Sequence, residues 1–262
     1  MPKQALDTAK KHKARKRFGQ NFLTDQKIID QIIAAIAPKQ DDNLLEIGPG
    51  QGAMTLPLLD RVEQLNVIEI DRDLIEILQS YNKPNLVIHQ GDALNFDLDL
   101  FNPPIRVVGN LPYNISSPIL FHLLAHRDKI IDMTFMLQKE VVERMSATHG
   151  SKIYGRLSVM MQAFFDVEYI FTVSPESFDP APKVDSAIVY LMPLKNCKVD
   201  NIQLFEQVVK AAFAHRRKTL KNCLKSLLTQ EQTSIDLSQR AEMLNIDAFI
   251  TLTQDYEKQH QN

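Results

Sequence analysis

The stretch LLEIGPGQG, residues 44–52, decides the fold. A short apolar run of strand type is followed at once by glycines at positions 48, 50 and 52. Glycine lets the backbone turn tightly and approach a ligand closely. The spacing is GxGxG, which differs from the GxGxxG fingerprint of dinucleotide-binding proteins. Since tight turns between a strand and a helix often contain glycine for structural reasons only, the meaning of this turn depends on the segments that follow it.

Short apolar runs recur after the glycine turn, and helical patterns at residues 72–81 and 118–125 separate some of them. The runs are LNVIEID, LVIHQGD, IRVVGN and MTFMLQ. Strands that alternate with helices predict a mostly parallel sheet with helices on both faces. Two later runs, VEYIFTV and SAIVYLM, have no full helix between them and predict an antiparallel pair at the sheet edge. The expected fold is therefore α/β, with a mostly parallel seven-stranded sheet.

Helical patterns flank the predicted sheet on both sides in the sequence. Before it, FLTDQKIIDQIIAAIAP predicts a helix that Thr24 or Asp25 caps and Pro38 ends, with isoleucines on one face. After Pro193 no further strand pattern appears, so a small all-helical domain is expected. We predict one domain at residues 1–194, whose residues 1–17 form a basic and mobile tail, and a second at 195–262 that binds RNA or the ribosome.

Composition places the chain among globular proteins. It has 262 residues, of which 44% are hydrophobic and 24% charged. No apolar run approaches the roughly 18–20 residues that a membrane span needs, and no signal peptide opens the chain, which predicts a cytoplasmic protein with no membrane partner. Cys197 and Cys223 lack CxxC spacing, so we expect two reduced thiols and no metal site.

Basic residues gather in two clusters although the net charge is −2. The first cluster includes Lys13, Arg15, Lys16 and Arg17. The second includes Lys210, Arg216, Arg217, Lys218, Lys221 and Lys225. Residues 41–100, which lie between the clusters, are strongly acidic. A basic tail is often only a solvated chain end, but two such clusters on an acidic protein favour a polyanionic partner.

Acidic residues end the two strands that follow the glycine turn. Glu69 can accept hydrogen bonds from ribose hydroxyls, and Asp92 can accept one from an adenine amino group. Either acid alone could be a solvated strand end. Together with Gly48 and Gly50 they indicate a cofactor site at the carboxyl ends of the strands. Because no phosphate-binding feature accompanies them, we expect a nucleoside without phosphates, such as S-adenosylmethionine (SAM).

The next strand ends in NLPY, residues 110–113, on the same predicted rim. The side-chain oxygen of Asn110 and the carbonyl of Leu111 could accept the two N–H groups of an exocyclic amine, so that its lone pair points at a methyl group. Pro112 would stiffen the turn, and Tyr113 offers a face on which a base stacks. Phe178 could cover the other face, although an ordinary buried phenylalanine is the simpler interpretation. An unstacked base, as in an RNA loop, fits such a pocket.

These motifs resemble those of the ribosomal RNA adenine dimethyltransferase family. NLPY alone is similar to a motif of amino-directed nucleic-acid methyltransferases. The family resemblance extends to RKRFGQNFL, LLEIGPGQGAMT, VIEIDRDL, VVGNLPYNISSPIL, FDPAPKVDSAIV and AAFAHRRKTLKN, in the same order along nearly the whole chain. The related erythromycin-resistance methyltransferases, which modify large-subunit RNA, usually match PAPKVDS and HRRKTLKN less fully.

The resemblance implies a Rossmann-like SAM-dependent methyltransferase acting on N6 of two adjacent adenosines. These adenosines lie in the 3′-terminal hairpin loop of 16S rRNA, in an immature small subunit, and the enzyme is expected to be a monomer. The family's SAM contacts carry onto Asn21, Leu23, Gly48, Glu69, Asp92 and Asn110. Both basic clusters would then bind rRNA phosphates. The alternatives are a non-catalytic assembly factor, a methyltransferase of 23S rRNA, and a nucleotide-dependent oxidoreductase.

Overall fold

The computed structural model describes residues 20–260, whose contacts divide into two compact units. The first comprises the residues up to Lys139 together with Ile170–Tyr190, and the second comprises Glu140–Tyr169 with Leu191–Asn262. The boundary between them cuts β7 (Phe165–Val173) and β9 (Ser186–Pro193). No helix among the described residues is long and apolar enough to cross a membrane.

The central sheet has seven strands in the order β4-β3-β2-β5-β6-β9-β7. The bounds of the first five in the chain are β2 Leu44–Ile47, β3 Leu65–Glu69, β4 Leu86–Gln90, β5 Ile105–Asn110 and β6 Ile130–Gln138. These five strands pair in parallel, with Leu44 of β2 opposite both Leu65 and Arg106. Their carboxyl ends therefore lie along one rim, as the sequence predicted.

The last two strands form the predicted antiparallel edge. The N–H of Lys139, just after β6, donates to the carbonyl of Asp185, just before β9, at 2.9 Å. The N–H of Leu194, just after β9, donates to the carbonyl of Phe164, just before β7, at 2.8 Å. Since these bonds join the end of one strand to the start of the next, β9 runs opposite to both of its neighbours. The fold is a mostly parallel α/β sheet of the Rossmann-like kind.

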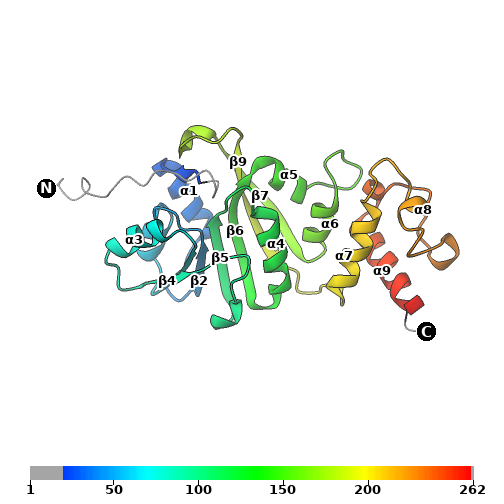
Figure 1. Ribbon diagram of the computed structural model, residues 1–262, viewed down its shortest axis with the longest axis horizontal. Coiled ribbons are helices and arrows are strands. Elements are labelled where there is room, and N and C mark those ends of the chain that lie inside the picture. Colours follow the sequence, from blue (N-terminus) through cyan, green and yellow to red (C-terminus); the bar gives the residue numbers. More distant parts are fainter. Residues whose placement is uncertain (1–19, 261–262) are drawn as a thin grey trace. The chain divides into compact units, whose positions relative to one another are not determined.

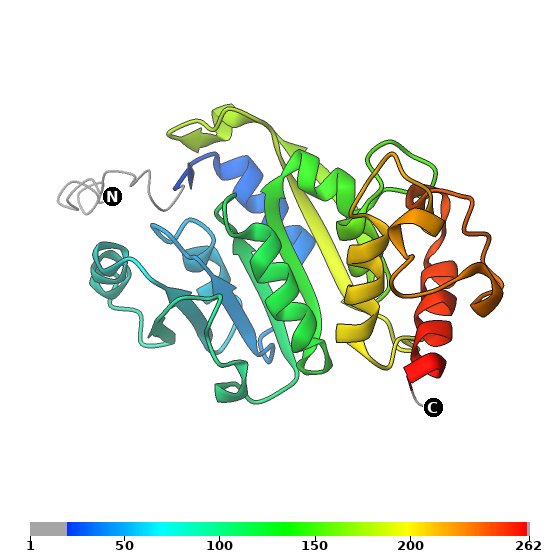
Figure 2. The ribbon, with the colours of Figure 1, turned by 45° about the vertical axis from the view of Figure 1, so that its right-hand side comes forward.

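Helices cover both faces of this sheet. In Figures 1 and 2, α4 (Ser116–Ala125) lies in front of the sheet and α1 (Gln26–Ile36) lies behind it. Asp25 caps α1, because its carboxylate accepts from the N–H groups of Lys27 and Ile28, and Ala37 ends it with a φ of 46°. Four isoleucines of α1 are buried, as its periodicity predicted, while Ile28 is half-buried. The remaining helices of the first unit are α2 Thr55–Leu59, α3 Arg72–Ser80, and the 3₁₀ helices Leu98–Leu100, Arg127–Lys129 and Pro175–Ser177.

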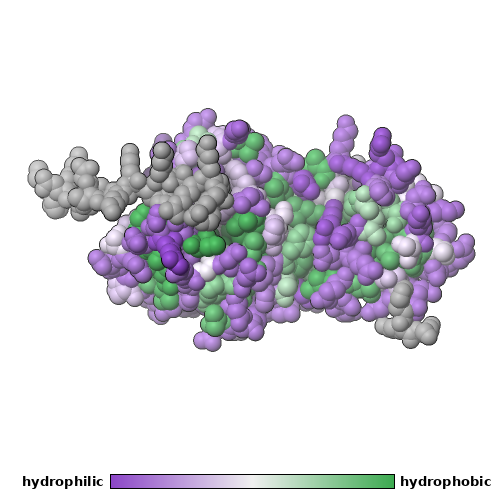
Figure 3. Space-filling model, viewed as in Figure 1, coloured by the Kyte–Doolittle hydropathy of each residue, from purple (hydrophilic) through white to green (hydrophobic). Residues whose placement is uncertain are grey.

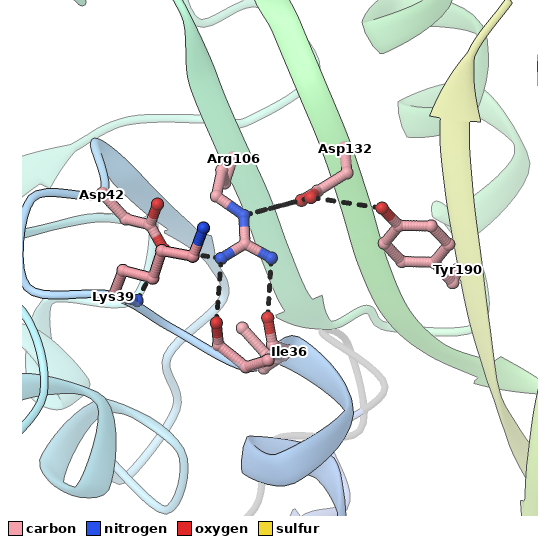
Figure 4. Close-up of polar contacts among 7 residues, drawn as sticks. Ile36, Lys39, Asp42, Arg106, Asp132 and Tyr190 are labelled. Carbon is pink, nitrogen blue, oxygen red and sulfur yellow. Dashed lines mark hydrogen bonds and ion pairs between the residues drawn. The ribbon is translucent and has the colours of Figure 1, made fainter.

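Arg106 of β5 ties the end of α1 to the sheet. Its guanidinium donates to both oxygens of Asp132, at 3.0 and 3.1 Å, and to Asp42 at 2.5 Å. It also donates to the carbonyls of Ile36 and Ala37, which α1 leaves without helical partners. Figure 4 shows the guanidinium lying between these groups, with the Tyr190 hydroxyl donating to Asp132 at 3.3 Å. A buried charge is thus matched by two carboxylates and two carbonyls.

The second unit is helical apart from the strand ends that it contains. Its helices are α5 Lys139–Met145, which begins one residue before the unit, α6 Arg156–Gln162, α7 Ile202–Ala212, α8 Leu220–Cys223, α9 Ile246–His260, and the 3₁₀ helices Gln230–Gln232 and Ala241–Met243. Phe205 of α7 packs edge-on against Phe164, and Phe213 stacks on Phe249 of α9. Phe213 also packs edge-on against Tyr154. The contacts of Phe164 and Tyr154 join residues 140–169 to the C-terminal helices, whereas the sequence placed the division at residue 195.

A polar connection divides the run LFEQVVKAAFAHRRKTLKNCLKSLL of the expected helical part into α7 and α8. Phe213 to Thr219 form a connection without α-helix, in which the N–H of Lys218 donates to the carbonyl of His215 at 2.9 Å. We define residues 213–219 and the first two residues of α8 as the basic connection. Residues 214–218 of this connection are exposed, so packing does not hold them as a helix.

Candidate active site

A cavity of about 220 Å³ opens at the rim where the strands end. It is lined by residues of the segments 20–23, 46–54, 68–74, 91–94 and 110–115. The predicted residues that the structure brings together here are Asn21, Leu23, Gly48, Gly50, Glu69, Asp92, Asn110, Pro112 and Tyr113. All of them belong to the first unit. Leu111 and Phe178 are not among the described residues that line this cavity.

The glycine turn forms one wall of the cavity. Gly50 has a φ of +59°, and a Cβ atom there would lie 3.4 Å from the ring of Phe22. Tyr81 lies at the C-terminal end of α3, and its hydroxyl donates to the carbonyl of Gln51 at 2.7 Å. This bond ties the glycine turn to α3. Position 50 thus favours glycine for its left-handed backbone, since a Cβ atom there would make only ordinary contact with Phe22.

Gly109 is a functional position that the sequence reasoning missed. A Cβ atom there would lie 2.4 Å from the carbonyl oxygen of Ile47 in β2. No real side chain tolerates that distance, so only glycine lets β5 pass β2 and place Asn110 beside the glycine turn. The sequence signal was the VVG that precedes NLPY, where a glycine at the end of a β-branched run marks a close backbone approach.

Backbone N–H groups fix the carboxylate of Glu69. Oε1 accepts from Ile70 at 2.8 Å and from Asp71 at 2.9 Å. Burial raises the pKa of Glu69, and the hydrogen bonds from Asp71, Ile70 and Gly50 oppose that rise. Because the N–H of Gly50 donates to this acid, the glycine turn and Glu69, which the sequence predicted separately, are joined by a hydrogen bond. Its carboxylate is held in place and can accept the hydroxyls of a sugar.

Asp92 is fixed in the same manner at the end of the next strand. Its Oδ1 accepts from the N–H of Leu94 at 3.0 Å, and its Oδ2 accepts from the side-chain amide of Asn95 at 3.2 Å. Gly91, which precedes it, contacts the ring of Phe96, since a Cβ atom there would lie 2.9 Å from that ring. Each carboxylate oxygen has lone pairs for a further donor.

Glu46 is a buried acid of the cavity wall that the sequence reasoning gave no binding role. It is 1% exposed, and the hydroxyl of Thr55 donates to it at 2.7 Å. Burial raises the pKa of Glu46 to about 7. The folded protein therefore holds this group more readily as the neutral acid than the unfolded chain does.

The unfolding free energy should accordingly fall as the pH rises from 4.5 to about 7. The ionisation of Glu46 should lower it by up to about 1.4 kcal/mol for each pH unit in this range. Glu46→Gln removes the ionisation and keeps an acceptor for Thr55. We expect the variant to match the parent near pH 4.5 and to exceed it by about 2–3 kcal/mol at pH 8. Urea unfolding of both proteins across this range measures the difference, and a difference that does not change with pH contradicts the prediction.

Residues 20–23, which we call the strap, line the cavity and are held by three sets of contacts. The amide of Gln20 donates to Asp71 at 3.2 Å. Phe22 and Leu23 form β1 and pair antiparallel with β8, Phe178–Asp179. The backbone carbonyl of Asn21 accepts from the side-chain amide of Asn110 at 3.3 Å. The pairing of β1 with β8 had no signal in the sequence, because two residues per strand are too few for a pattern.

Asn110 is oriented by its contact with the strap. Its amide nitrogen faces the carbonyl of Asn21, so Oδ1 is the atom left to accept from a ligand. The backbone continues the sheet for one more residue, because the N–H of Leu111 donates to the carbonyl of Met136 at 3.2 Å. The Leu111 side chain is buried. The end of β5 thus holds the backbone of Leu111 and the side-chain oxygen of Asn110 next to each other.

Tyr113 is half-buried in the cavity wall and is held at both ends. The hydroxyl of Ser116 donates to its carbonyl at 3.1 Å, and its own hydroxyl lies 2.7 Å from that of Ser186. Phe178, by contrast, is 5% exposed and packs in the core with Leu23. In this structure Phe178 supports the strap, and a role against the target base stays a prediction.

The basic residues fall into two groups by their placement. Lys13, Arg15, Lys16 and Arg17 lie outside the described residues. Arg216, Arg217, Lys218 and Lys221 are exposed in the basic connection, and Figure 3 shows hydrophilic side chains over this part of the surface. Within residues 20–260, the ion pairs involve none of these four residues. Their charges are available to a polyanion.

The polar groups of the cavity are amides, carboxylates and a phenol. They belong to Gln20, Asn21, Glu46, Gln51, Glu69, Asp92, Asn110, Tyr113 and Asn114. In the described part of the chain, no group of three or more His, Cys, Asp or Glu side chains could hold a metal ion. Cys197 and Cys223 are both free thiols.

Known proteins share this sequence and fold. The family model described as ribosomal RNA adenine dimethylase matches residues 11–258. A protein of Pseudomonas syringae pv. syringae named Ribosomal RNA small subunit methyltransferase A is 53% identical to this chain, over 92% of this chain and 94% of that protein. The one from Hydrogenovibrio crunogenus is also 53% identical, over 95% and 98%.

Two solved structures are similar over most of the chain. A dimethyladenosine transferase from Plasmodium falciparum is 29% identical with a TM-score of 0.79, covering 91% of this chain and 98% of that one. The 23S rRNA methyltransferase ErmE is 25% identical with a TM-score of 0.72, covering 90% and 100%. Fold, cavity and sequence agree: the chain is a SAM-dependent methyltransferase that belongs to the ribosomal RNA adenine dimethylase family.

Proposed function

We propose that the chain transfers methyl groups from SAM to N6 of two adjacent adenosines in the 3′-terminal hairpin loop of 16S rRNA. The substrate is an immature small ribosomal subunit, which the protein binds as a monomer in the cytoplasm. Relatives about half identical over more than 90% of the chain carry a small-subunit name, which favours this target over 23S rRNA. The observation that carries the proposal is the orientation of Asn110, whose acceptor oxygen is free to receive an amine.

The cavity fits SAM by the chemistry of its groups. Glu69 would accept the ribose hydroxyls and Asp92 the adenine amino group, since both carboxylates are fixed by neighbouring N–H groups. Gly48 and Gly50 allow the main chain to approach closely, and Asn21 and Leu23 add contacts from the strap. Bound there, SAM supplies an electrophilic methyl group on its sulfonium.

The residues of NLPY activate the target amine by position. Asn110 Oδ1 and the Leu111 carbonyl accept its two N–H groups, which favours a tetrahedral nitrogen with its lone pair exposed. Tyr113 stacks on the base, and Pro112 fixes the turn that joins Leu111 to Tyr113. No general base is required, because the amine proton leaves after the methyl group has arrived. Proximity and alignment supply much of the rate.

A transfer assay tests the function directly. Small subunits that lack the modification are incubated with the protein and with SAM labelled in its methyl group, and the labelled bases are mapped. We expect label on two adjacent adenosines near the 3′ end of 16S rRNA. Label confined to large-subunit RNA would reassign the target, and a protein that binds subunits without any transfer would be an assembly factor.

The basic connection should supply affinity without altering the chemistry. Changing Arg217 and Lys218 to glutamine should weaken subunit binding and lower the slope of log affinity against log salt by about 0.7–0.9 for each phosphate that is no longer neutralised. Filter binding at several salt concentrations measures the slope. Lys198→Gln is the control, because its ammonium already pairs with Asp247 at 2.7 Å. An unchanged slope in the double variant would exclude the connection as a phosphate-binding element.

A further inference from the structure

Ser186 contacts the predicted base platform, and no motif chemistry assigns it a task. We propose that Ser186 is a positioning residue for methyl transfer: its hydroxyl bond to Tyr113 holds the aromatic ring in the place at which it stacks on the target adenine. This inference rests on the proposed function, since it deepens the role given to Tyr113. It concerns the alignment of the base and leaves the cofactor contacts unchanged.

The anchor at Ser186 is rigid. Ser186 is the first residue of β9 and has no exposed surface. The carbonyl of the residue before it, Asp185, accepts from the N–H of Lys139 at 2.9 Å, which joins the start of β9 to the end of β6. The side chains of Lys139 and Asp185 also pair at 3.7 Å. The hydroxyl of Ser186 is therefore fixed to the sheet.

The ring that it holds lies in a less regular segment. Tyr113 lies beyond the end of β5 and before the start of α4, and lines the cavity. Its backbone is held through Ser116, but that contact leaves the two side-chain torsions of the tyrosine unrestrained. The 2.7 Å bond to Ser186 lies at the far end of the ring, so it fixes the first side-chain torsion and with it the place of the ring in the cavity wall. The hydroxyl oxygen lies on the axis of the second torsion, which the bond restrains only through the preference of a phenolic hydrogen bond for the plane of the ring. Fixing the ring before the base arrives lowers the ordering cost of stacking.

The hydroxyl of Tyr113 has no part in stacking itself. Stacking needs only the aromatic face, so phenylalanine at position 113 would suffice for it. A half-buried phenol, however, must find a partner, and the fully buried hydroxyl of Ser186 must do so as well. The two groups satisfy each other. Burial raises the pKa of Tyr113 further above neutral pH. The pair thus links the loop of NLPY to the edge of the sheet.

A double-mutant cycle separates positioning from mere stability. Tyr113→Phe and Ser186→Ala each leave one hydroxyl without a partner, whereas the double variant removes both. We expect each single variant to lower the single-turnover rate on unmodified small subunits about tenfold, because a misplaced ring misaligns the base. The double variant should regain much of the lost thermal stability but stay as slow as the single variants.

Cofactor binding and a second tyrosine provide the controls. Calorimetric affinity for SAM should stay unchanged in all variants, which also shows that they fold. Tyr190→Phe removes another phenol of β9, whose hydroxyl donates to Asp132 at 3.3 Å away from the cavity, and it should keep the parent rate. Serine-to-alanine at position 186 removes a single oxygen, so no space has to be refilled.

The outcomes distinguish this inference from the proposed function. No transfer to small subunits by the unaltered protein would overturn the proposed function, and the role of Ser186 with it. Transfer by the unaltered protein and an equal rate in Ser186→Ala would overturn only the role of Ser186. A double variant that regains rate together with stability would make the pair structural and would equally overturn the inference.

Discussion

Replacing Asn110 with alanine should lower the turnover of methyl transfer by about 100- to 1,000-fold, the usual cost of losing one preorganised hydrogen-bonding group at a reacting centre. The side-chain oxygen that accepts from the target amine is lost, while Glu69, Asp92 and the glycine turn remain. SAM affinity should therefore fall far less than turnover. Turnover on unmodified small subunits and calorimetric SAM binding measure the two quantities separately.

Asn110→Asp is the matched variant, because it keeps the shape and the acceptor. It removes the donor to the carbonyl of Asn21, 3.3 Å away, and brings an oxygen against that carbonyl instead. We expect Asn110→Asp to lose turnover as well. Because this variant keeps the acceptor oxygen, its loss should be smaller than that of the alanine variant. Parent-like turnover of Asn110→Ala would remove Asn110 from the mechanism. Parent-like turnover of Asn110→Asp would show that its orientation by the strap is unimportant.

Arg106→Met should cost about 3–5 kcal/mol of unfolding free energy, the usual result of breaking a buried ion pair from one side. Asp132 and Asp42 would keep their charges in a site where their side chains are only 8% and 13% exposed. The carbonyls of Ile36 and Ala37 would also lose their donor. Urea unfolding of the parent and the variant at neutral pH measures the change.

Two further variants define the origin of that cost. Lys83→Met breaks an ion pair with Asp60 whose side chains are 41% and 75% exposed, and it should cost less than about 1 kcal/mol. Adding Asp132→Asn to Arg106→Met removes one of the stranded charges and should restore part of the stability. A loss below about 1 kcal/mol in Arg106→Met would mean that water reaches the two carboxylates and that the network contributes little.

The sheet and its cofactor rim were predictable because their signals are local and repeated. Each parallel strand is mostly apolar, and polar residues such as Glu69 and Asp92 stand at or just beyond its carboxyl end. The cap of α1 and its buried isoleucines follow from period and side-chain chemistry alone. What the local patterns determine is which strands exist and which of their ends carry polar groups, and the parallel topology then brings those ends together.

Features that depend on a distant partner were not predictable. The two-residue strands β1 (FL) and β8 (FD) carry no sequence signal for their pairing, since that contact joins residues far apart in the chain. The bond between Tyr113 and Ser186 is of the same kind. The burial of Glu46 required knowledge of what packs beside it, and Phe178 could not be assigned to core or cavity. In the basic connection, the exposed residues 214–218 gain nothing from packing that would hold them as a helix.

The contact between the strap and Asn110 has a consequence for mutational scanning. The group that orients the side-chain amide of Asn110 is the backbone carbonyl of Asn21, and every amino acid carries such a carbonyl. A library of side-chain substitutions at position 21 would report effects on cofactor affinity and leave this carbonyl in place. Only changes that displace the main chain, such as proline at position 22 or a deletion within the strap, would expose its contribution. A position that tolerates many side chains can in this way still be indispensable to the reaction.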